Sequence, residues 1–415
     1  MRSPSPAYAY LLVAAAIAAL ISICANPGIY EPYLEGQDYL QIAQDRPETT
    51  YNYYAGRMLH PFAARMLAGV VPMDLRRAFF VVGVISLLAL CVFLSLHIFK
   101  LKLNPLLLIP LLCVPAVITL YRGYYFQDLF HAMLVAALLV LSSYSAWAAL
   151  PILFLLHLTR ESTILLSVWL ALISLRRRAW ALALSIVAVA VVGTGVTSTA
   201  VHAALPNKHG VNILEMYVLK VLYAFCHNLL GLVFWTDTNA STINCVPRWV
   251  ASVAGRLGSI RQVGFCGFQP GLILGTLAAF LGPFGVEPAI LARLVRESWR
   301  TLPKQGYVFQ AAFGYGAICL VLAPLIGTDP ARYFLYAWPL YWLALPQLLT
   351  GVTFDRSRTI SLVALHASAC IAGFSLADTP SSSGQLARVV VLLALNVLAY
   401  HCVSKMLPVA SETQK

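Results

Sequence analysis

Residues 78–98 read AFFVVGVISLLALCVFLSLHI, an unbroken apolar run that contains no Asp, Glu, Lys or Arg. A membrane-spanning α-helix needs about 20 such residues, because each residue adds about 1.5 Å across a hydrocarbon core of about 30 Å. Of the 415 residues in the chain, 60% are hydrophobic and 11% are charged, whereas soluble domains carry roughly 25% charged residues. So few charges cannot cover a water-exposed surface, and the sequence therefore predicts a protein that faces lipid over much of its area.

Similar apolar runs along the chain predict an all-α, polytopic transmembrane helix bundle of about 12 spans. Two of these runs are short and meet at the polar step His157–Ser162, so two tilted short helices and a broken hairpin both stay open. The first run lacks a small-x-small cleavage site before Asn26, so we interpret it as an uncleaved first helix rather than a signal peptide. The candidate spans lie near 7–25, 78–98, 104–120, 127–143, 147–159, 162–175, 179–200, 269–285, 307–326, 331–350, 359–377 and 385–403.

One membrane domain, residues 1–408, is expected, with outer loops at 26–77 and 203–268 and a disordered tail at 409–415. Residues 211–235 in the second loop are long and apolar enough to span, yet they contain several charged and polar side chains. A span there would reverse the topology of every later helix. We therefore predict that this segment is a helix lying in the outer interface or leaning on the bundle.

Basic residues are distributed unevenly about the predicted spans. With the N-terminus in the cytoplasm, most Lys and Arg clusters fall in cytoplasmic loops, as the positive-inside rule expects, although the outer loop 26–77 also holds five arginines. The net charge of +12 is explained by topology, so no nucleic-acid partner is predicted. The basic residues expected inside are Lys100, Lys102, Arg176 to Arg178, Arg293, Arg296, Arg300, Lys304, Arg356, Arg358 and Lys405.

Acidic residues are biased toward the opposite side of the membrane. Of the 16 acids, only Glu287, Glu297, Asp355 and Glu412 fall inside. Acids contribute little to topology, so this bias needs another cause, and a functional site on the outer face would supply one.

The nine cysteines show no metal-binding spacing. Most of them lie in apolar runs, where a free cysteine behaves as a small packing residue. In the second outer loop, Cys245 and Cys266 could form a disulfide if that loop faces an oxidising space, but the sequence does not decide this.

Soluble-enzyme motifs such as the P-loop and the H-E-x-x-H zinc motif are absent, and the candidate chemistry lies in polar residues at the outer ends of helices. Asp38 follows the first helix and suits a general base or a metal ligand, with a turn or helix cap as the structural alternative. Arg57 and His60 are three residues apart and share a helix face. Together they could bind a phosphate or anchor the chain at the interface.

Three further groups follow along the chain. Asp128 and His131 lie at the top of a helix and either serve a site or bond each other. Arg160 and Glu161 interrupt an apolar stretch at about 2.5–3.5 kcal/mol per charge on the insertion scale, so they indicate a site or an ion-pair network. Asp329, Arg332 and Tyr333 stand at another helix start, where Asp329 could cap the helix while Arg332 binds an anion. Together with the groups around Asp38 and Arg57, these groups come from four separate inter-helix connections on one side of the membrane.

This pattern resembles the integral-membrane glycosyltransferases of the GT-C fold, such as protein O-mannosyltransferases and the aminoarabinose transferase of lipid A. Members have about 11–13 helices, a long first outer loop with an acid soon after the first helix, and a second acid in the short loop after the third helix. Asp38 matches the first acid and Asp128 the second. The resemblance covers the topology of most of the chain, but the Asp-Glu or Asp-x-Asp pair of several members is missing, as is a large soluble C-terminal domain.

The resemblance implies an inverting transferase that moves a sugar from a polyprenyl-phosphate donor to a hydroxyl of a glycan, lipid or protein acceptor. Asp38 is expected to deprotonate the acceptor, while Asp128 and Glu161 hold the acceptor or orient arginines. The residues expected to bind substrate, largely through the departing phosphate, are Arg57, His60, His131, Arg160, Arg332 and Tyr333.

The expected location is a bacterial inner membrane, with the site facing the periplasm. The need for a divalent cation, Mg or Mn, stays open, because the first outer loop offers one acid where several relatives have two. Two rival functions also stay open. One is a transporter or flippase of lipid-linked glycans, and the other is a polymerase or ligase of such glycans.

Overall fold

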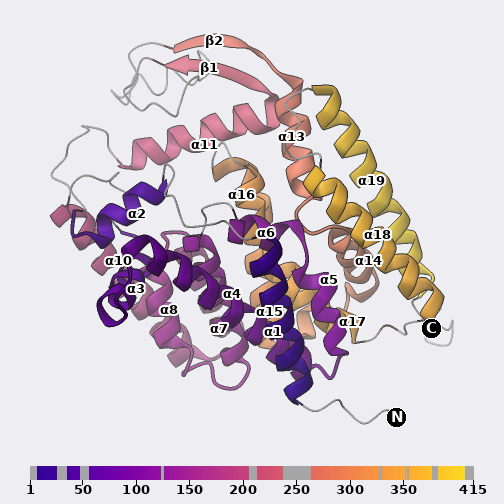
Figure 1. Ribbon diagram of the computed structural model, residues 1–415, viewed down its shortest axis with the longest axis horizontal. Coiled ribbons are helices and arrows are strands. Elements are labelled where there is room, and N and C mark those ends of the chain that lie inside the picture. Colours follow the sequence, from indigo (N-terminus) through magenta and orange to yellow (C-terminus); the bar gives the residue numbers. More distant parts are fainter. Residues whose placement is uncertain are drawn as a thin grey trace. The chain divides into compact units, whose positions relative to one another are not determined.

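The computed structural model describes residues 7–25, 35–46, 56–122, 126–204, 213–236, 263–326, 330–350, 352, 355–375 and 382–406. The described chain is helical except for one antiparallel ribbon of β1 (Leu232–Thr236) and β2 (Val263–Phe268) (Figure 1). The all-α prediction is therefore confirmed. The candidate disulfide Cys245–Cys266 lies outside the residues whose side chains are described.

Six helices of the described chain are long and apolar enough to cross a bilayer, which supports the prediction of a membrane protein. The expected count of about 12 spans is not confirmed, because several candidate runs form shorter or interrupted helices. The long helices are α1 (Ala7–Cys24), α4 (Leu75–Lys100), α10 (Trp180–Ala204), α15 (Tyr307–Ile326), α18 (Arg356–Ser375) and α19 (Ser382–Ser404).

Two of the expected spans are interrupted, and prolines lie at the interruptions. The run 104–120 forms a 3-10 turn and two short helices, α5 (Leu108–Leu112) and α6 (Pro115–Arg122). Proline lacks the N–H that an inner helical turn needs and is tolerated best at a helix start, which is where Pro115 stands. The run 331–350 alternates between α-helical, 3-10 and π-helical segments. It consists of α16 (Pro330–Phe334), a 3-10 turn, the π-helix Leu340–Ala344 and α17 (Leu345–Leu349).

The chain divides into two compact units, which we describe separately. Unit 1 comprises residues 1–208, 299–315 and 342–350, and unit 2 comprises 209–298, 316–341 and 351–415.

The long helix α4 is the centre of unit 1. Its first turn is capped by Asp74, whose carboxylate accepts a hydrogen bond of 2.9 Å from the Arg77 amide. It packs against α1, α3 (Leu59–Val70) and α7 (Phe126–Ser142), and its buried face is apolar except for Ser86, Ser95 and His97. Burial of that face stabilises the helix more than its intrinsic propensity does.

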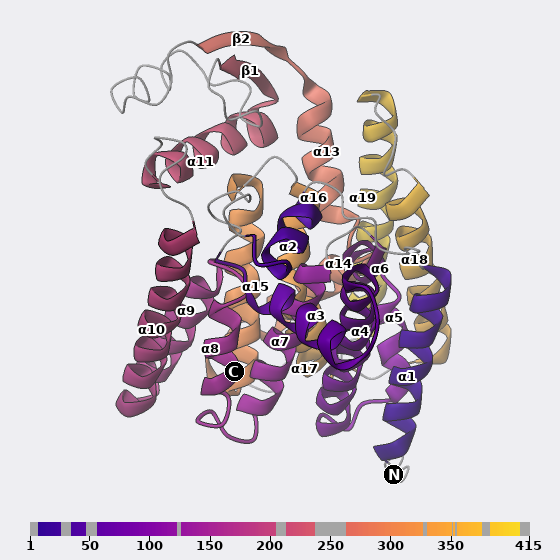
Figure 2. The ribbon, with the colours of Figure 1, turned by 60° about the vertical axis from the view of Figure 1, so that its left-hand side comes forward.

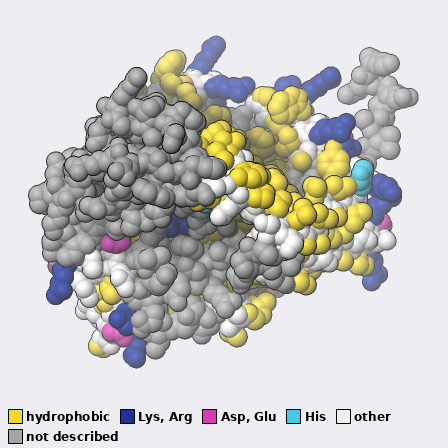
Figure 3. Space-filling model, turned by 90° about the horizontal axis from the view of Figure 1, so that it is seen from above, with side chains coloured by type: hydrophobic (Ala, Val, Ile, Leu, Met, Phe, Trp, Pro, Cys, Tyr) yellow, Lys and Arg dark blue, Asp and Glu magenta, His cyan; other side chains and the backbone are white. Residues whose placement is uncertain are grey.

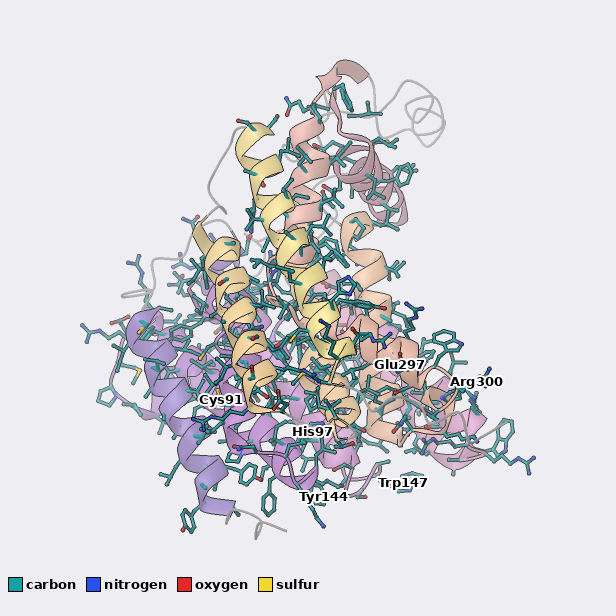
Figure 4. The ribbon with its side chains drawn as sticks, turned by 90° about the vertical axis from the view of Figure 1, so that its right-hand side faces the viewer. Cys91, His97, Tyr144, Trp147, Glu297 and Arg300 are labelled. Atoms are coloured by element: carbon teal, nitrogen blue, oxygen red, sulfur yellow. The ribbon has the colours of Figure 1, made fainter. Side chains whose placement is uncertain are left out.

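Aromatic residues mark the end of unit 1 at which α4 ends. Tyr144 and Trp147 follow α7 there (Figure 4), and both side chains are exposed. Lys100, the last residue of α4, places its Nζ atom 4.4 Å from the centre of the Tyr144 ring. Exposed aromatic rings beside a lysine are typical of a membrane–water interface.

Two short helices, α8 (Leu150–His157) and α9 (Thr163–Arg176), form where spans were expected at 147–159 and 162–175. The chain therefore forms two short helices that meet at the polar step 157–162. Both helices pack against α10 (Figure 2). Gly193 of α10 makes this possible, because a Cβ atom there would lie 2.6 Å from Cβ of His157. The connection 158–162 is thereby placed inside unit 1 rather than in a long continuous helix.

In unit 2, α19 packs against α13 (Pro270–Leu281), α14 (Glu287–Ser298) and α18. The helix α11 (Ile213–Leu230) packs against α13 and runs across the direction of α13 and α19 in both Figures 1 and 2. Many large apolar side chains of α18 and α19 are exposed, and Figure 3 shows hydrophobic atoms on the side where these two helices lie. Such faces are suited to contact with lipid.

Packing of α9 against α15 requires a glycine at position 314. A Cβ atom at Gly314 would lie 2.0 Å from the Trp169 ring, and the indole Nε1 atom is fixed by a 2.9 Å hydrogen bond to the Gln310 carbonyl. We expect Gly314→Ala to lower the free energy of unfolding by about 1–3 kcal/mol, because the core is overpacked. The measurement is the thermal unfolding midpoint of the purified protein in detergent.

Gly306→Ala is the matched control, since nothing lies within 4 Å of a Cβ atom placed there. Equal midpoints for the two variants would show that the α9–α15 contact does not have this geometry.

Candidate functional site

Charged and polar side chains of unit 1 gather where the start of α3 meets the connection between α8 and α9. The Leu59 amide donates a hydrogen bond of 3.1 Å to the Leu158 carbonyl, which ties the two segments together. Arg57 and Arg160 stand close to this link in sequence, one on each segment. Arg57 and Arg160, which are 103 positions apart in the chain, therefore lie in one region.

Arg57 and Glu161 form a two-pronged ion pair. The Nε atom of Arg57 lies 3.1 and 3.3 Å from the two carboxylate oxygens, and Nη2 lies 3.1 Å from Oε2. The remaining terminal nitrogen, Nη1, donates to the Tyr39 hydroxyl at 3.0 Å. Tyr39 belongs to α2 (Glu35–Ala43), so one guanidinium connects three separate segments. A planar fork suits this geometry and lysine cannot reproduce it.

The two partners of this pair differ in exposure. The side chain of Arg57 is 10% exposed and that of Glu161 is 41% exposed. Burial alone would raise the pKa of Glu161, but the charges of Arg57 and Arg160 hold it below its usual value. Burial likewise opposes the charge of Arg57, while Glu161 and Tyr39 raise its pKa well above the usual value. Both groups are therefore charged at neutral pH, and the carboxylate is the one that solvent reaches.

Arg160 and Asp128 form a second pair, which is fully buried. The Arg160 side chain is 5% exposed and the Asp128 side chain is 0% exposed, and Nη1 of Arg160 donates to Oδ1 of Asp128. Asp128 lies in the first turn of α7 and Arg160 in the connection between α8 and α9. A buried charge without its partner is strongly destabilising, so each member of the pair holds the other in place.

A histidine on α7 adds a third contact to the same connection. The Thr159 hydroxyl donates its one proton to the Leu156 carbonyl at 2.6 Å, so it can only accept from His131, whose Nδ1 atom is 2.7 Å away. This assigns the proton of His131 to Nδ1. The hydrogen bond positions the ring beside the Asp128–Arg160 pair, whose charges both act on His131.

His60, on the first turn of α3, is surrounded by aromatic rings. Its ring centre lies 5.1 Å from that of Phe79, 5.4 Å from that of Phe130 and 6.4 Å from that of Tyr39. Neither ring nitrogen has a hydrogen-bond partner among the described residues. Burial lowers the pKa of His60 to about 3, against a smaller opposing effect of Asp128. At neutral pH this histidine is uncharged, so it can offer a hydrogen bond to a substrate but not a positive charge.

The other predicted site residues are Asp38, on α2, and Arg332 and Tyr333, in unit 2. Asp38 is half-buried on α2, directly before the buried Tyr39. Neighbouring residues on a helix point apart, so the contact of Tyr39 with Arg57 does not place the Asp38 carboxylate. Arg332 and Tyr333 lie on α16 in unit 2, where Arg332 is buried and Tyr333 is half-buried. Asp329 lies outside the described residues.

Six of the nine predicted site residues are thus brought together in unit 1, and we call them, with Tyr39 and Thr159, the arginine–carboxylate cluster. The predicted members are Arg57, His60, Asp128, His131, Arg160 and Glu161.

Tyr39 and Thr159 are hydrogen-bonded members of the arginine–carboxylate cluster that the sequence did not predict as site residues. Each stands beside a residue that it did predict, namely Asp38 and Arg160. Hydroxyl groups next to charged residues in an apolar chain are the signal that could have found them, since a buried hydroxyl needs a partner.

Among the described residues, no three or more His, Cys, Asp or Glu side chains are arranged to hold a metal ion. The carboxylates of Asp128 and Glu161 each have a guanidinium partner, which occupies oxygens that a divalent cation would need.

No protein-family model, no curated protein and no solved structure matches this chain. Inference about its function therefore starts from its own residues.

The buried ion pair leads to a stability prediction. We expect Asp128→Ala to lower the free energy of unfolding by about 3–5 kcal/mol, because Arg160 keeps a buried charge without its carboxylate partner. The measurement is the unfolding midpoint in detergent. The control is Asp45→Ala, which removes an exposed ion pair with Arg65 and should leave the midpoint nearly unchanged. A small effect at Asp128 would mean that the pair is solvated.

His60 leads to a prediction about pH. Its folded-state pKa of about 3 lies below the ordinary 6.5, so unfolding takes up a proton between these values and stability is lost as pH falls from 6.5 toward 3. Replacing the ring by phenylalanine removes this proton uptake. We expect His60→Phe to reduce the pH sensitivity of unfolding in this window by up to about 1.4 kcal/mol per pH unit.

The other buried histidines are present in both proteins, so the difference between wild type and variant isolates His60. Parallel pH profiles of the unfolding midpoint would contradict the prediction.

Proposed function

We propose that this chain is a membrane glycosyltransferase, which moves a sugar from a lipid-linked phosphate donor to a hydroxyl acceptor. The observation that supports this most directly is the arginine–carboxylate cluster, which gathers two charged guanidinium groups inside an apolar helical unit. Ionisable groups are expensive in such surroundings and usually serve a function. A reaction that releases a phosphate anion within reach of lipid needs fixed positive charge of this kind.

The arginines are suited to the leaving group. As the bond from the sugar to the phosphate oxygen breaks, negative charge develops on the lipid phosphate, and guanidinium groups held in position stabilise it without reorganising. Arg57 is the better candidate for direct contact, because its carboxylate partner is partly exposed while that of Arg160 is fully buried. Glu161 and Asp128 act by orienting the two arginines, which is one of the two roles expected for them.

Asp38 is the proposed base. The acceptor oxygen attacks the anomeric carbon and its proton passes to the Asp38 carboxylate. The bond between the anomeric carbon and the phosphate oxygen breaks, and the polyprenyl phosphate leaves with the electron pair. Because the acceptor attacks from the face opposite the phosphate, the configuration of the anomeric carbon inverts. Asp38 belongs to α2, the helix whose Tyr39 hydroxyl bonds Arg57, and the proposal requires the Asp38 carboxylate to reach the same region. No step of this proposal passes through a metal ion.

The proposed site faces the outside of a bacterial inner membrane. Its segments belong to loops that the distribution of Lys and Arg assigns to the extracytoplasmic side. Within unit 2, the crosswise course of α11 supports a helix that lies in a membrane interface instead of spanning, and this would keep the later helices in the predicted topology. Arg332 and Tyr333 stay candidate substrate residues of unit 2.

Replacing the base tests the proposal. We expect Asp38→Asn to abolish sugar transfer from a polyprenyl-phosphate donor while expression stays normal, because the amide cannot accept the acceptor proton. The measurement is mass spectrometry of cell-envelope glycans from cells with each variant as the only copy. Asp45→Asn is the matched control, because Asp45 is an exposed acid just beyond the end of α2. Full transfer by Asp38→Asn would refute the role of Asp38.

Replacing the guanidinium group of Arg57 tests its proposed role in binding phosphate. We expect Arg57→Lys to lower the rate of transfer about 10²–10³-fold, because lysine keeps the charge but loses the fixed geometry toward Glu161 and Tyr39. Arg65→Lys, in an exposed ion pair, should leave the rate unchanged. The same glycan analysis separates the rival functions. Transfer of preassembled blocks would indicate a ligase or polymerase, and lipid movement without bond cleavage would indicate a flippase.

A further inference from the structure

Unit 2 contains a buried carboxyl group that the proposed transfer reaction does not use. The turn between α13 and α14 has the sequence GPFGVE at 282–287, and Glu287 is the first residue of α14. Glu287 is 2% exposed, and neither of its carboxylate oxygens has a hydrogen-bond partner among the described residues. An ionised carboxylate in this position would be very costly.

The start of α14 does not solvate this carboxyl group. The Glu287 amide donates to the Phe284 carbonyl at 3.1 Å, and the amides of Ala289 and Ile290 donate to the Val286 carbonyl at 3.1 and 3.2 Å. Pro288 has no N–H group. The amides that make a helix start attractive to anions are therefore already engaged.

Helices α18 and α19 pack closely over the same turn. Gly285 has a φ of +58°, and a Cβ atom there would lie 2.8 Å from the His366 ring and 3.0 Å from Sγ of Cys370. Asn396 of α19 donates to the Gly285 carbonyl at 3.3 Å, while its own Oδ1 is a buried acceptor with no partner among the described residues. The turn thus holds three buried acceptor oxygens, two of Glu287 and one of Asn396, that have no hydrogen-bond partner among the described residues.

The third neighbour is a π-helix. Tyr341 lies in the π-helix Leu340–Ala344, its ring stacks on Phe284 with 4.2 Å between ring centres, and its hydroxyl is within electrostatic reach of Glu287. π-Helical turns are rare and frequently lie at functional sites. The carboxyl group therefore borders an irregular helix rather than a regular packed one.

The titratable groups around the turn are few. They are Tyr341 on the π-helix, His366 and Cys370 on α18, and Arg388 on α19, which donates to the Gly373 carbonyl at 2.9 Å. The helix α13 contributes none. Burial raises the pKa of Glu287 well above its usual value, and it is the one cause of that shift. The group is therefore neutral where ordinary glutamates are charged.

We propose that Glu287 is a proton-binding site of unit 2, which holds one proton while α18 and α19 cover the turn 282–287 and releases it when the turn opens to water. Ionisation under the closed cover would leave a buried carboxylate without a partner, so the charged form and the closed turn exclude each other. The closed state is favoured at low pH and lost as pH rises through the folded-state pKa of Glu287. The site goes beyond the proposed transfer reaction, whose cluster lies in unit 1.

The first test is infrared spectroscopy of the full-length protein in detergent, from about pH 5 to about pH 10. The wild type should show the absorption of a protonated carboxyl group at neutral pH, and this band should disappear as pH rises. Glu287→Gln should lack the band at every pH. The titration of the wild type decides the matter alone if the variant does not fold.

The second test uses the cysteine beside the turn. Cys370 is buried, is not in a disulfide and lies 3.5 Å from Nε2 of His366, so its alkylation by a maleimide, read by peptide mass spectrometry, reports opening of the cover. We expect Cys370 to become reactive in the wild type over the pH range in which the band disappears, and to stay protected in Glu287→Gln, which cannot ionise. Comparison with the variant removes the effect of pH on the thiol itself.

Three results would overturn the proposal. The first is a carboxyl group already ionised at about pH 5, and the second is a band that persists to about pH 10. The third is loss of the band with no change in the labelling of Cys370, because proton release would then be independent of the turn. None of these readouts depends on sugar transfer, so failure here leaves the transferase proposal standing.

Discussion

An apolar interior accepts a charge only if a partner is placed beside it, and unit 1 depends on this constraint. Arg160 and Asp128 are both buried, and each makes the other tolerable. Their pairing connects the first turn of α7 to the connection between α8 and α9. Because that connection is also tied to α3 by the Leu59–Leu158 hydrogen bond, the same few contacts organise both the packing of the helices and the polar cluster.

The break between α8 and α9 is the structural element that makes the cluster possible. The connection contains three adjacent polar residues, Thr159, Arg160 and Glu161, and each has a different partner. In the non-helical connection Arg160 contacts Asp128 while Glu161 contacts Arg57. Thr159 completes the arrangement by bonding the Leu156 carbonyl and His131 together. Three consecutive residues, 159–161, thus bring together two ion pairs and a histidine.

The acids of the two units illustrate opposite solutions to burial. Glu161 stays ionised because two arginines lie near it, and its pKa is lowered. Among the described residues no cation shifts the pKa of Glu287, and burial alone raises it. Composition cannot distinguish these cases, because both residues are single glutamates in largely apolar stretches of the chain. Only the neighbours in space decide whether a carboxyl group orients a cation or carries a proton.

The sequence alone determined the class of protein, because apolar runs of sufficient length have few alternatives to lipid-facing helices. It also identified Arg57, Asp128, Arg160 and Glu161 as candidates, since charges in apolar segments need a reason. It could not determine which charge pairs with which, because pairing depends on how helices distant in sequence pack. The tertiary structure decided the Arg57–Glu161 and Arg160–Asp128 pairs, gave Arg57 its contact with the Tyr39 hydroxyl, and divided expected spans at Cys113 and along 330–349. These features follow from local packing around prolines, glycines and buried partners, which no hydropathy pattern encodes.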